Sequence, residues 1–522
     1  MHKNNIILYL CNWGPHVAFQ DLLDKCADIP HEIKMIRIPC TGRISKTLLF
    51  KAFEIGADGV ALVGCVAGTC RYGSGTNVAE KNVEDTRNIL DLLGIGKERL
   101  ELATFLPDDS NELLEFLKRF SQNIQKIGKS PIVHQKIDFE KRLISREKIG
   151  SILKKHNIYV CQDCGKCSSG CSLALSGKTF SPRSVANSLI AGDIYSENVF
   201  KDIWSCLTCG KCYDICPMAV NFPEFIRDIR ELFRTHGMSP RETHGGFFQS
   251  LMRTMISPDI KPLHWQYLPE GIRLNKESKT LFFGGCSPYF DTFFRNHLTV
   301  STFDIMVDSL KVLNFFDIEP AILENERCCG HDLLWSGDLN SFLELAKLNS
   351  NIINSKGFDT IVTSCPECLK TLLYDYPKYG IKLNPKVVHI YDLLESEIDK
   401  GAVSFKKFDK KMLFKEACRL DLGENEQSKK LVERFKKIQD ISVIPNECCG
   451  NSSWVGCDAF SKALQTKQLK QARNMGFDLI VTSCPKCQIH LKCAMEDVFI
   501  GKELEIEMMD LTSVIAKTIF WT

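Results

Sequence analysis

Short apolar runs alternate with helical patterns over the first part of the chain, and each run leads into a cysteine. The runs are Ile6–Leu10 before Cys11, Ile33–Ile38 before Cys40, and Val60–Val63 before Gly64-Cys65. Helical spacing of apolar positions is found at Asp21–Lys25, Lys46–Glu54 and Ala79–Leu93. Short apolar strands that alternate with helices predict βα units and a parallel sheet.

Four cysteines are expected at one edge of this sheet. Ligands of open parallel sheets collect beyond the carboxyl ends of the strands, where Cys11, Cys40 and Cys65 would lie, with Cys70 close behind. Four thiolates in one place can hold a [2Fe-2S] cluster. The alternative is that these cysteines are small buried hydrophobic residues.

The stretch from Cys161 to Pro217 carries the strongest metal-binding pattern. It has two runs of Cys-x2-Cys-x2-Cys-x3-Cys, namely Cys161, Cys164, Cys167 and Cys171, then Cys206, Cys209, Cys212 and Cys216. Such runs bind two [4Fe-4S] clusters, and the fourth thiolate of each run ligates the other cluster. We therefore expect one cluster on Cys161, Cys164, Cys167 and Cys216, and the second on Cys206, Cys209, Cys212 and Cys171. Zinc is the alternative, although it requires neither the third cysteine nor the final Cys-Pro.

The two clusters are expected to replace a hydrophobic core in this segment. Helical patterns occur at Pro182–Ile190 and Phe222–Phe233, and residues 237–280 are expected to form an irregular, proline-rich connection. The sequence lacks a Gly-x-Gly-x-x-Gly fingerprint after a strand, and Gly73-x-Gly75 is too short to count as one. We therefore expect no flavin or nicotinamide site in this chain.

The last part of the chain contains an internal duplication with a period of about 120 residues. Asn325-Glu326-Arg327-Cys328-Cys329-Gly330 recurs as Pro445-Asn446-Glu447-Cys448-Cys449-Gly450, and the stretch from Gly357 to Cys368 recurs as Gly476 to Cys487. One more cysteine precedes each set, Cys286 after the expected strand Leu281–Phe283 and Cys418 after Met412–Phe414. The pattern predicts a duplicated α/β domain.

Each copy offers five thiolates. They are Cys286, Cys328, Cys329, Cys365 and Cys368 in the first copy, and Cys418, Cys448, Cys449, Cys484 and Cys487 in the second. Five is one more than a cubane cluster needs, and two adjacent cysteines point in divergent directions, so we expect a larger, irregular ligand shell. The Ile-Val-Thr-Ser strand runs into Cys-Pro and a helix, whose N-terminal dipole favours the thiolate.

Composition and charge narrow the function classes. A chain of 522 residues that is 44% hydrophobic and 25% charged predicts three or four globular domains. The net charge of +2 argues against nucleic acid as the main partner. The longest apolar run, Gly59–Gly68, is shorter than the ~20 residues of a membrane helix, so we expect no integral membrane segment. The N-terminus does not resemble a secretory signal, which predicts a cytoplasmic protein.

Cysteine usage points to metal. The 25 cysteines are clustered in a long chain without a recognisable signal, which indicates metal binding in preference to disulfides. Only Cys26, Cys457 and Cys493 fall outside the motifs, and we expect them to be buried spectators.

The first domain contains four short motifs, Cys11-Asn12-Trp13, Cys40-Thr41-Gly42-Arg43, Gly56-Ala57-Asp58-Gly59-Val60 and Gly64-Cys65-x4-Cys70-x-Tyr72. In these motifs the domain resembles the delta (iron–sulfur) subunit of methyl-viologen-reducing hydrogenase. The resemblance implies a [2Fe-2S] cluster that passes electrons from a hydrogenase or formate dehydrogenase to a flavoprotein. The family usually has Cys-Asn-Trp-Cys at the first motif, whereas this chain has Gly14. His16 could replace the missing ligand, but we favour a solvated loop histidine at this position.

The duplicated domain resembles the catalytic subunit of heterodisulfide reductase, with its repeated CCG domain. The resemblance implies that each five-cysteine set binds a noncubane [4Fe-4S] cluster and that a disulfide is cleaved between the two. The middle segment then resembles the ferredoxin-like subunit of the same enzyme. Around Cys418 this chain reads Ala417-Cys418-Arg419, where the family commonly has Pro-Cys-His.

The sequence as a whole predicts a multidomain protein of α/β and α+β class. We expect a delta-subunit-like domain at 1–135, a helical two-cluster ferredoxin domain at 136–240, a linker at 241–280, and CCG domains at 281–400 and 401–522. The expected function is electron transfer to a disulfide in a complex with a flavoprotein that resembles the flavin-binding subunit of heterodisulfide reductase. The alternative is an electron-transfer component of a dehydrogenase or quinone-linked complex without disulfide chemistry.

Overall fold

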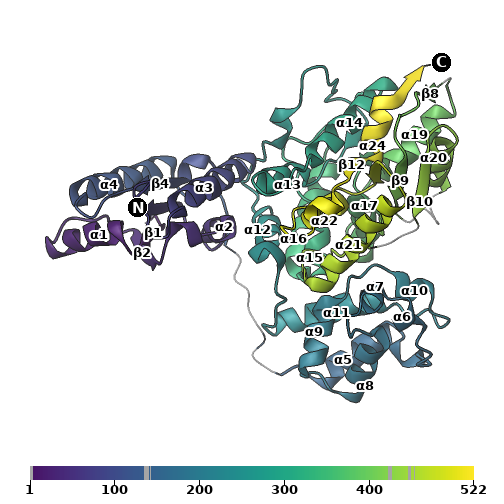
Figure 1. Cartoon of the computed structure of the whole chain (residues 1–522), viewed down its shortest axis with the longest axis horizontal. Helices are drawn as coiled ribbons and strands as arrows, with labels where there is room; N and C mark the ends of the chain where they lie inside the picture. Colours follow the sequence, from purple (N-terminus) through teal and green to yellow (C-terminus); the bar gives the residue numbers. More distant parts are fainter. Residues whose placement is uncertain are drawn as a thin grey trace. The chain divides into compact units, whose positions relative to one another are not determined.

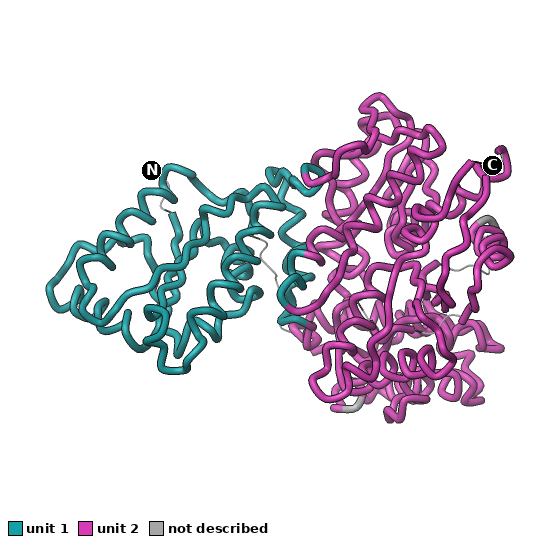
Figure 2. The backbone as a smooth tube through the Cα atoms, turned by 45° about the horizontal axis from the view of Figure 1, so that its top comes forward, with its two compact units in different colours: residues 1–137, 244–266, 292–296 teal, residues 138–243, 267–291, 297–522 magenta. Residues whose placement is uncertain are grey.

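The computed structural model describes residues 4–134, 140, 143–401, 403–420, 426–444, 448–451 and 453–521 (Figure 1). The chain divides into two compact units (Figure 2). Unit 1 comprises residues 1–137, 244–266 and 292–296, and unit 2 comprises residues 138–243, 267–291 and 297–522. Among the described helices, none is both long and apolar enough to cross a membrane.

Unit 1 is built around a four-stranded parallel sheet. Its strands are β1 (Ile6–Cys11), β2 (Ile33–Ile38), β3 (Gly59–Gly64) and β4 (Leu100–Thr104), in the order β2-β1-β3-β4. Every neighbouring pair is parallel, so the predicted parallel-sheet α/β fold is confirmed. The sequence pattern does not single out β4, because Glu101 and Thr104 interrupt its apolar run.

Four helices connect or follow these strands. They are α1 (Gly14–Asp24), α2 (Lys46–Glu54), α3 (Gly75–Leu92) and α4 (Ser110–Ile127). Helix α2 has the predicted bounds. Helix α1 begins before the predicted Asp21, because Pro15 in its first turn has a φ already suited to a helix. Helices α1 and α4 pack together over the sheet, where Leu8, Leu22 and Leu117 share one buried core.

A further helix of unit 1, α12 (Phe247–Thr254), lies in the stretch expected to be irregular. The Phe247 ring lies 5.2 Å from the ring of Phe50, and Arg253 Nε pairs with Glu54 Oε1 at 2.5 Å. Both partners belong to α2, so α12 packs on that helix. The expectation of an irregular connection is wrong over these residues, since the prolines that suggested it lie before and after the helix.

In unit 2, the cysteine-run segment is helical, as predicted. Its helices are α5 (Arg146–Lys155), α6 (Lys166–Ser169), α7 (Ser172–Leu175), α8 (Pro182–Ala191), α9 (Glu197–Ser205), α10 (Lys211–Asp214) and α11 (Phe222–Thr235). Asp163 and Gly165 precede α6 with φ of 52° and 79°, and Thr208 and Gly210 precede α10 with φ of 49° and 91°. The two cysteine runs therefore fold as copies of one loop–helix unit.

This segment also has an apolar core of its own. Ile229 and Phe233 of α11 are fully buried together with Ile203 of α9. The expectation that clusters would replace a hydrophobic core is therefore wrong in part. Helices α9 and α11 are amphipathic, so burying their apolar faces supplies a core beside the cysteines.

The two copies of the duplicated domain each contain a parallel sheet. The first has β5 (Thr280–Phe282), β6 (Thr360–Thr363) and β7 (Lys386–His389) in the order β5-β6-β7. The second has β9 (Met412–Lys415), β10 (Ile441–Ile444), β11 (Leu479–Thr482) and β12 (Glu507–Asp510) in the order β10-β9-β11-β12. A single parallel bridge between Leu281 and Ala321 stands where the second copy has β10. The repeated motif residues Pro445–Glu447 lie outside the described part of the chain.

The helices of the two copies pack reciprocally (Figure 1). Helix α14 (Thr302–Phe315) of the first copy packs on α24 (Leu511–Thr518) of the second, and α19 (Ile390–Ile398) of the first packs on α20 (Glu426–Lys436) of the second. Each of these pairs joins the helix after the first strand of one copy to the helix after the last strand of the other. Strands β8 (Val403–Phe405) and β13 (Ile519–Trp521) add an antiparallel pair.

Among the described residues, eight further α-helices belong to the two copies. They are α13 (Ser287–Phe294), α15 (His331–Trp335), α16 (Leu339–Asn354), α17 (Pro366–Lys370), α18 (Tyr376–Lys378), α21 (Ala459–Asn474), α22 (Pro485–Met495) and α23 (Gly501–Leu504). Helices α17 and α22 each begin with the Pro of a Cys-Pro pair, which suits the first helical position.

Candidate metal centres

The structure brings the four cysteines of unit 1 together at the carboxyl edge of its sheet. Cys11 ends β1 and Cys65 directly follows β3, and their Sγ atoms lie 3.7 Å apart. The Sγ atoms of Cys40 and Cys70 lie 3.9 Å apart. Burial, and then the nearby thiols Cys65 and Cys40, raise the pKa of Cys11 to about 11. Burial, and then the neighbouring thiols, also raise the pKa of Cys40. Buried thiols of this kind fit a site that adds positive charge.

Helix α3 shapes one side of this site. Burial opposes ionisation of Cys70, but backbone hydrogen bonds from Tyr72, Gly75 and Thr76 lower the pKa of Cys70. A Cβ at Gly75 would lie only 2.5 Å from the Sγ of Cys40 and 2.7 Å from that of Cys70. Only glycine at this position lets both thiols approach the start of α3. The Gly73-x-Gly75 pattern is too short for a nucleotide fingerprint, and it gives no sign of this steric role.

Gly14 stands where the delta-subunit family usually has a cysteine. A Cβ at Gly14 would lie 3.8 Å from Cys65 Sγ, so the fold points this position toward the thiols. His16 is half-buried in the first turn of α1, and burial and then the charge of Arg37 lower its pKa. A ligand role for His16 stays a prediction.

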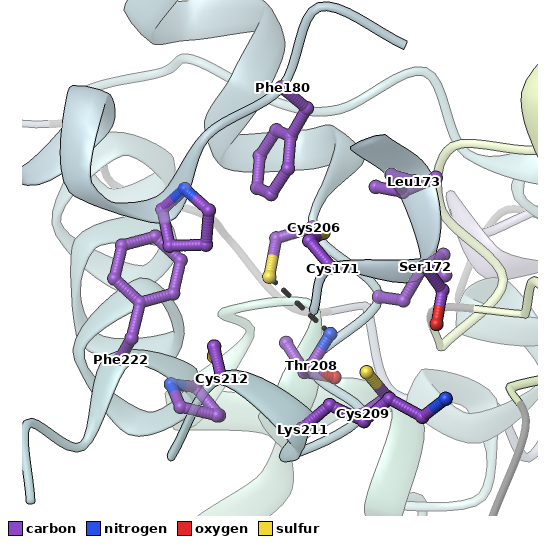
Figure 3. A pocket seen from close by; sticks show the side chains of 13 residues that line it. Cys171, Ser172, Leu173, Phe180, Cys206, Thr208, Cys209, Lys211, Cys212 and Phe222 are labelled. Atoms are coloured by element: carbon purple, nitrogen blue, oxygen red, sulfur yellow. Dashed lines mark hydrogen bonds between the residues drawn. The ribbon is translucent and has the colours of Figure 1, made fainter. Parts of the chain in front are cut away.

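In unit 2, a pocket gathers four cysteines from both runs (Figure 3). Its thiols are those of Cys171, Cys206, Cys209 and Cys212, and its apolar walls include Leu173, Phe180 and Phe222. Thr208 N donates a hydrogen bond to Cys206 Sγ at 3.4 Å. This pocket places the last cysteine of the first run beside the first three of the second. That these four thiols ligate one cluster stays a prediction.

Burial dominates the chemistry of this pocket. It raises the pKa of Cys206 to about 11 and that of Cys209 to about 12, and burial together with its thiol neighbours raises the pKa of Cys212 further. Arg230 and Arg419 act against burial at Cys206. Thiols of this kind ionise when a cation binds them, because a coordinating metal deprotonates the thiol.

The other four cysteines of the segment are the first three of the first run and the last of the second run. Cys161, Cys167 and Cys216 are half-buried and Cys164 is exposed. Helices α6 and α10, which carry Cys167 and Cys212, contact each other. Val220 N donates to Cys216 Sγ at 3.4 Å.

The first copy of the duplicated domain assembles its five thiols into one chain of contacts, in which Cys328, Cys329 and Cys368 are buried and Cys286 and Cys365 are half-buried. Thiol hydrogen bonds link Cys286 to Cys328, Cys328 to Cys329, Cys329 to Cys368 and Cys368 to Cys365. Gly285 has a φ of 76°, and a Cβ there would lie 3.1 Å from Cys368 Sγ. The backbone therefore approaches this set closely.

The second copy repeats the arrangement. Thiol hydrogen bonds link Cys418 to Cys448, Cys448 to Cys449, Cys449 to Cys487 and Cys487 to Cys484. In both copies, the long helix that follows the Cys-Cys pair provides a side-chain amide. This amide donates a hydrogen bond to the backbone carbonyl of the first cysteine of the pair. Asn349 Nδ2 donates to Cys328 O at 2.9 Å, and Gln468 Nε2 donates to Cys448 O at 2.8 Å.

A buried charge network lies beside the first set. Lys486 Nζ pairs with Asp332 Oδ1 at 2.5 Å and also pairs with Glu367. These residues and His331 line one pocket with Cys286, Cys328, Cys329, Cys365 and Cys368. His331, Asp332 and Glu367 could hold a cation by their geometry, but the Lys486 ammonium already pairs with both carboxylates. The sequence gives no sign of this network, since its members lie far apart in the chain.

Two cations lie beside the second set. Lys415 and Arg419 are buried, and they occupy the positions that Phe283 and Ser287 hold in the first copy. A hydrogen bond with Cys448, and then the charge of Arg419, lower the pKa of Cys418 to about 6. The second set is therefore more cationic than the first at these two positions.

The second set also adjoins the ferredoxin-like pocket. Cys448 belongs to the same buried core as Cys206 and Leu207. Arg419 Nη2 donates to Thr208 Oγ1 at 3.0 Å, which ties the residue after Cys418 to the loop between Cys206 and Cys209. Buried, convergent thiols with cations nearby fit iron–sulfur clusters, which carry net negative charge on their thiolate ligands.

The three cysteines outside the motifs are not all buried. Cys26 and Cys457 are exposed and Cys493 is half-buried. The expectation of buried spectators is wrong for the first two, because Cys26 lies in the turn after α1 and Cys457 in the loop before α21.

Comparison with known families matches the chain in three places. The methyl-viologen-reducing hydrogenase delta subunit family matches residues 6–128, and a 4Fe-4S dicluster domain matches residues 157–220. A cysteine-rich domain matches twice, over residues 281–372 and 412–492. These last two matches fall on the two copies of the duplication.

Individual relatives agree with this division. The vhu iron–sulfur subunit of the F420-non-reducing hydrogenase of Methanocaldococcus jannaschii is 31% identical over 131 residues, which is 25% of this chain and 98% of the relative. One subunit of the dihydromethanophenazine:CoB–CoM heterodisulfide reductase of Methanosarcina acetivorans is 24% identical over 366 residues, covering 67% of this chain and 84% of the relative.

A third relative is one of the subunits of the CoM/CoB fumarate reductase of Methanothermobacter marburgensis. It is 25% identical over 298 residues, which is 56% of this chain and 57% of the relative. The chain spans about half the length of several such curated relatives.

These matches identify the chain as an iron–sulfur electron-transfer protein related to subunits of heterodisulfide reductase and CoM/CoB fumarate reductase. Its N-terminal domain covers iron–sulfur subunits of F420-non-reducing hydrogenases almost end to end. The chain therefore belongs to the methyl-viologen-reducing hydrogenase delta-subunit family, and it continues that domain into a 4Fe-4S dicluster domain and a duplicated cysteine-rich domain.

Proposed function

We propose that this chain is an oxidoreductase of the heterodisulfide reductase type, which passes electrons to a disulfide at its two five-cysteine sets. The observation that carries the proposal is the presence of two largely buried five-thiol sets in one compact unit with a ferredoxin-like pocket. The repeated order of thiol contacts supports two sites of the same kind.

The ligands of four clusters follow from the cysteine sets. We assign one [4Fe-4S] cluster to Cys161, Cys164, Cys167 and Cys216, and a second to Cys171, Cys206, Cys209 and Cys212. We assign two noncubane [4Fe-4S] clusters to the five-cysteine sets that begin at Cys286 and Cys418. When bound, such clusters supply one-electron transfer at potentials tuned by charge and hydrogen bonds.

The protein residues define a route between these sites. Leu207 and Cys448 share a core, and Arg419 joins Thr208 to the second five-cysteine set. Electrons would thus pass from the Cys171–Cys212 pocket to the second set. Cys484 of the second set and Cys365 of the first influence each other electrostatically, which supports a short step between the two sets.

Disulfide reduction consumes two electrons and two protons and yields two thiols. Two neighbouring one-electron sites suit this stoichiometry. Lys486, Asp332 and Glu367 line the pocket of the first set, so a substrate at this site would meet a fixed polar wall.

Unit 1 would serve as the junction with partner proteins. We assign a [2Fe-2S] cluster to Cys11, Cys40, Cys65 and Cys70, which meet at one sheet edge. The partners would be a hydrogenase or formate dehydrogenase and a flavoprotein resembling the flavin-binding subunit of heterodisulfide reductase, because relatives of unit 1 are hydrogenase subunits. No flavin site is assigned to this chain. Cysteines clustered at metal-ligand spacing suit the reducing cytoplasm, where disulfides are rare.

Anaerobically purified protein provides the test. We expect iron, acid-labile sulfide and cluster EPR signals, and we expect low-molecular-weight disulfides to oxidise the dithionite-reduced protein. Cys328→Ser should abolish that oxidation while leaving the ferredoxin-type signals. Oxidation by disulfide that survives in Cys328→Ser and Cys448→Ser would contradict the catalytic assignment. Clusters that no disulfide reoxidises would favour an electron-transfer role alone, and zinc without labile sulfide would exclude both.

A further inference from the structure

Arg419 contacts segments that belong to three cysteine sets. It directly follows Cys418 of the second five-cysteine set. Its Nη2 donates to Thr208 Oγ1 at 3.0 Å, in the loop of the ferredoxin-like pocket. Its guanidinium carbon lies 4.2 Å from the ring centre of Trp335, in the helix that starts after the first Cys-Cys pair. The side chain is buried, with 8% of the residue exposed.

Trp335 is held from a second direction. Arg230 Nη1 donates to Trp335 O at 2.8 Å, and Arg230 Nη2 donates to Cys206 O at 2.6 Å. Trp335 Nε1 donates to Asp375 Oδ2 at 3.3 Å. The face on which Arg419 stacks is therefore fixed, and the guanidinium is fixed with it.

The duplication supplies an internal comparison. Position 419 corresponds to Ser287 of the first copy, and position 415 holds Lys where the first copy has Phe283. At these two positions, the shared fold thus carries cations only at the set next to the ferredoxin-like pocket. A guanidinium keeps its proton at all accessible pH values, so this charge is permanent.

We propose that Arg419 is a positioning residue that clamps the Cys206–Cys209 loop to the second five-cysteine set and raises the reduction potentials of the centres at both. A fixed positive charge favours the reduced, more negative state of a nearby cluster, and the effect is larger at a buried site than in water. The inference rests on the proposed presence of clusters, but it does not depend on the identity of the substrate.

Redox titration followed by EPR tests the charge. Arg419→Gln removes it and should move the midpoint potentials of the second five-cysteine centre and of the Cys171–Cys212 centre to lower values. Arg419→Lys retains the charge and should keep both potentials near those of the unaltered protein. The matched control is Arg434→Gln in the same copy, where the arginine pairs with Glu395 and Asp399, and its potentials should not move.

Thr208→Val tests the clamp separately. It removes the hydrogen bond but keeps the charge, so it should slow electron transfer to the second set while leaving the midpoint potentials in place. Unchanged potentials in Arg419→Gln at full iron content would overturn the proposal. So would equal shifts in the Gln and Lys variants. If the Gln variant loses iron, a lowered potential in Arg419→Lys, which keeps the charge, would overturn the proposal. Absence of clusters from the unaltered protein would instead refute the proposed function on which the inference rests.

Discussion

Glu367 and Lys486 occupy the same position in the two copies of the Cys-Pro-x-Cys motif, and their side chains form an ion pair. Lys486 is 3% exposed, and it also pairs with Asp332. Burial lowers the pKa of a lysine, but the two carboxylates reverse that effect and raise the pKa of Lys486. The duplicated motif has thus diverged into complementary charges that join the two copies.

We expect Lys486→Met to destabilise the protein strongly. It leaves Asp332 and Glu367 buried without their cation, and removing one partner of a buried pair costs about 3–5 kcal/mol. Urea denaturation under anaerobic conditions, followed by circular dichroism, measures the loss in the free energy of unfolding.

The control is Lys378→Met, which breaks a more exposed pair between Lys378 and Glu224. A pair of this kind contributes about 1 kcal/mol or less. Equal losses in the two variants would contradict the view that burial sets the strength of the Lys486 network.

Cys171→Ser should remove the centre held by the second cysteine run while sparing the centre held by the first. Cys171 lines the pocket of Cys206, Cys209 and Cys212, although it belongs to the other run in sequence. We expect iron content to fall by one cluster and one of the two ferredoxin-type EPR signals to disappear.

Cys216→Ser should remove the other signal, so the two variants form a reciprocal pair. Cys26→Ser is the matched control, because Cys26 is exposed and lies outside every set. Loss of the same EPR signal in Cys171→Ser and Cys216→Ser would refute the exchange of fourth ligands between the runs.

The sequence predicts the strand ends well, because they depend on local spacing, whereas the ligands of each cysteine set stay a prediction. An apolar run followed by a cysteine places that cysteine at a sheet edge, and a repeated Cys-x2-Cys loop folds the same way twice. Helix α12 is missed because eight residues between prolines give too short a pattern to outweigh the proline signal. The core of the cysteine-run segment is missed because its apolar residues come from helices that meet only in the folded state.

The charged groups around the sites could not be predicted in the same way. Glu367 and Lys486 are visible in the repeat, but nothing local indicates that they meet. The sequence also shows that the second copy has Arg419 where the first has Ser287. The contact of Arg419 with Thr208 crosses from one domain to another, so the sequence could not predict it. Gly75 illustrates a third case, since its role is steric and depends on two thiols from different loops.

Gly14→Cys should strengthen metal binding in unit 1. Gly14 does not have the positive φ that would require glycine, so its backbone can accept a side chain. A Cβ at this position would lie 3.8 Å from Cys65 Sγ, and its nearest contact would be Phe105 O at 3.3 Å. A fifth thiol near the set should slow removal of iron by a chelator, followed as loss of visible absorbance. Val17→Cys is the control, because it adds a thiol to an exposed position of the same helix. Faster iron loss in Gly14→Cys than in the control would show that the set cannot accept another ligand.

Asp510 should make the stability of the second copy depend on pH. This residue caps α24, with Oδ1 accepting from Thr512 N at 2.9 Å, and within the described part of the chain its Oδ2 has no hydrogen-bond partner. Burial raises the pKa of Asp510 to about 7, whereas an aspartate in an unfolded chain has a pKa of about 3.9. Between these values the folded state binds the extra proton, so stability falls as pH rises through that window.

Asp510→Asn keeps a neutral group with a carbonyl oxygen for the Thr512 N–H, and it cannot ionise. We expect the melting temperature of the unaltered protein to fall, relative to this variant, between about pH 4 and about pH 7. The difference between the two curves removes the contribution of groups common to both proteins. Parallel curves over this range would mean that Asp510 is ionised in the folded protein, and that its buried oxygen is stabilised by a group that the cap geometry does not reveal.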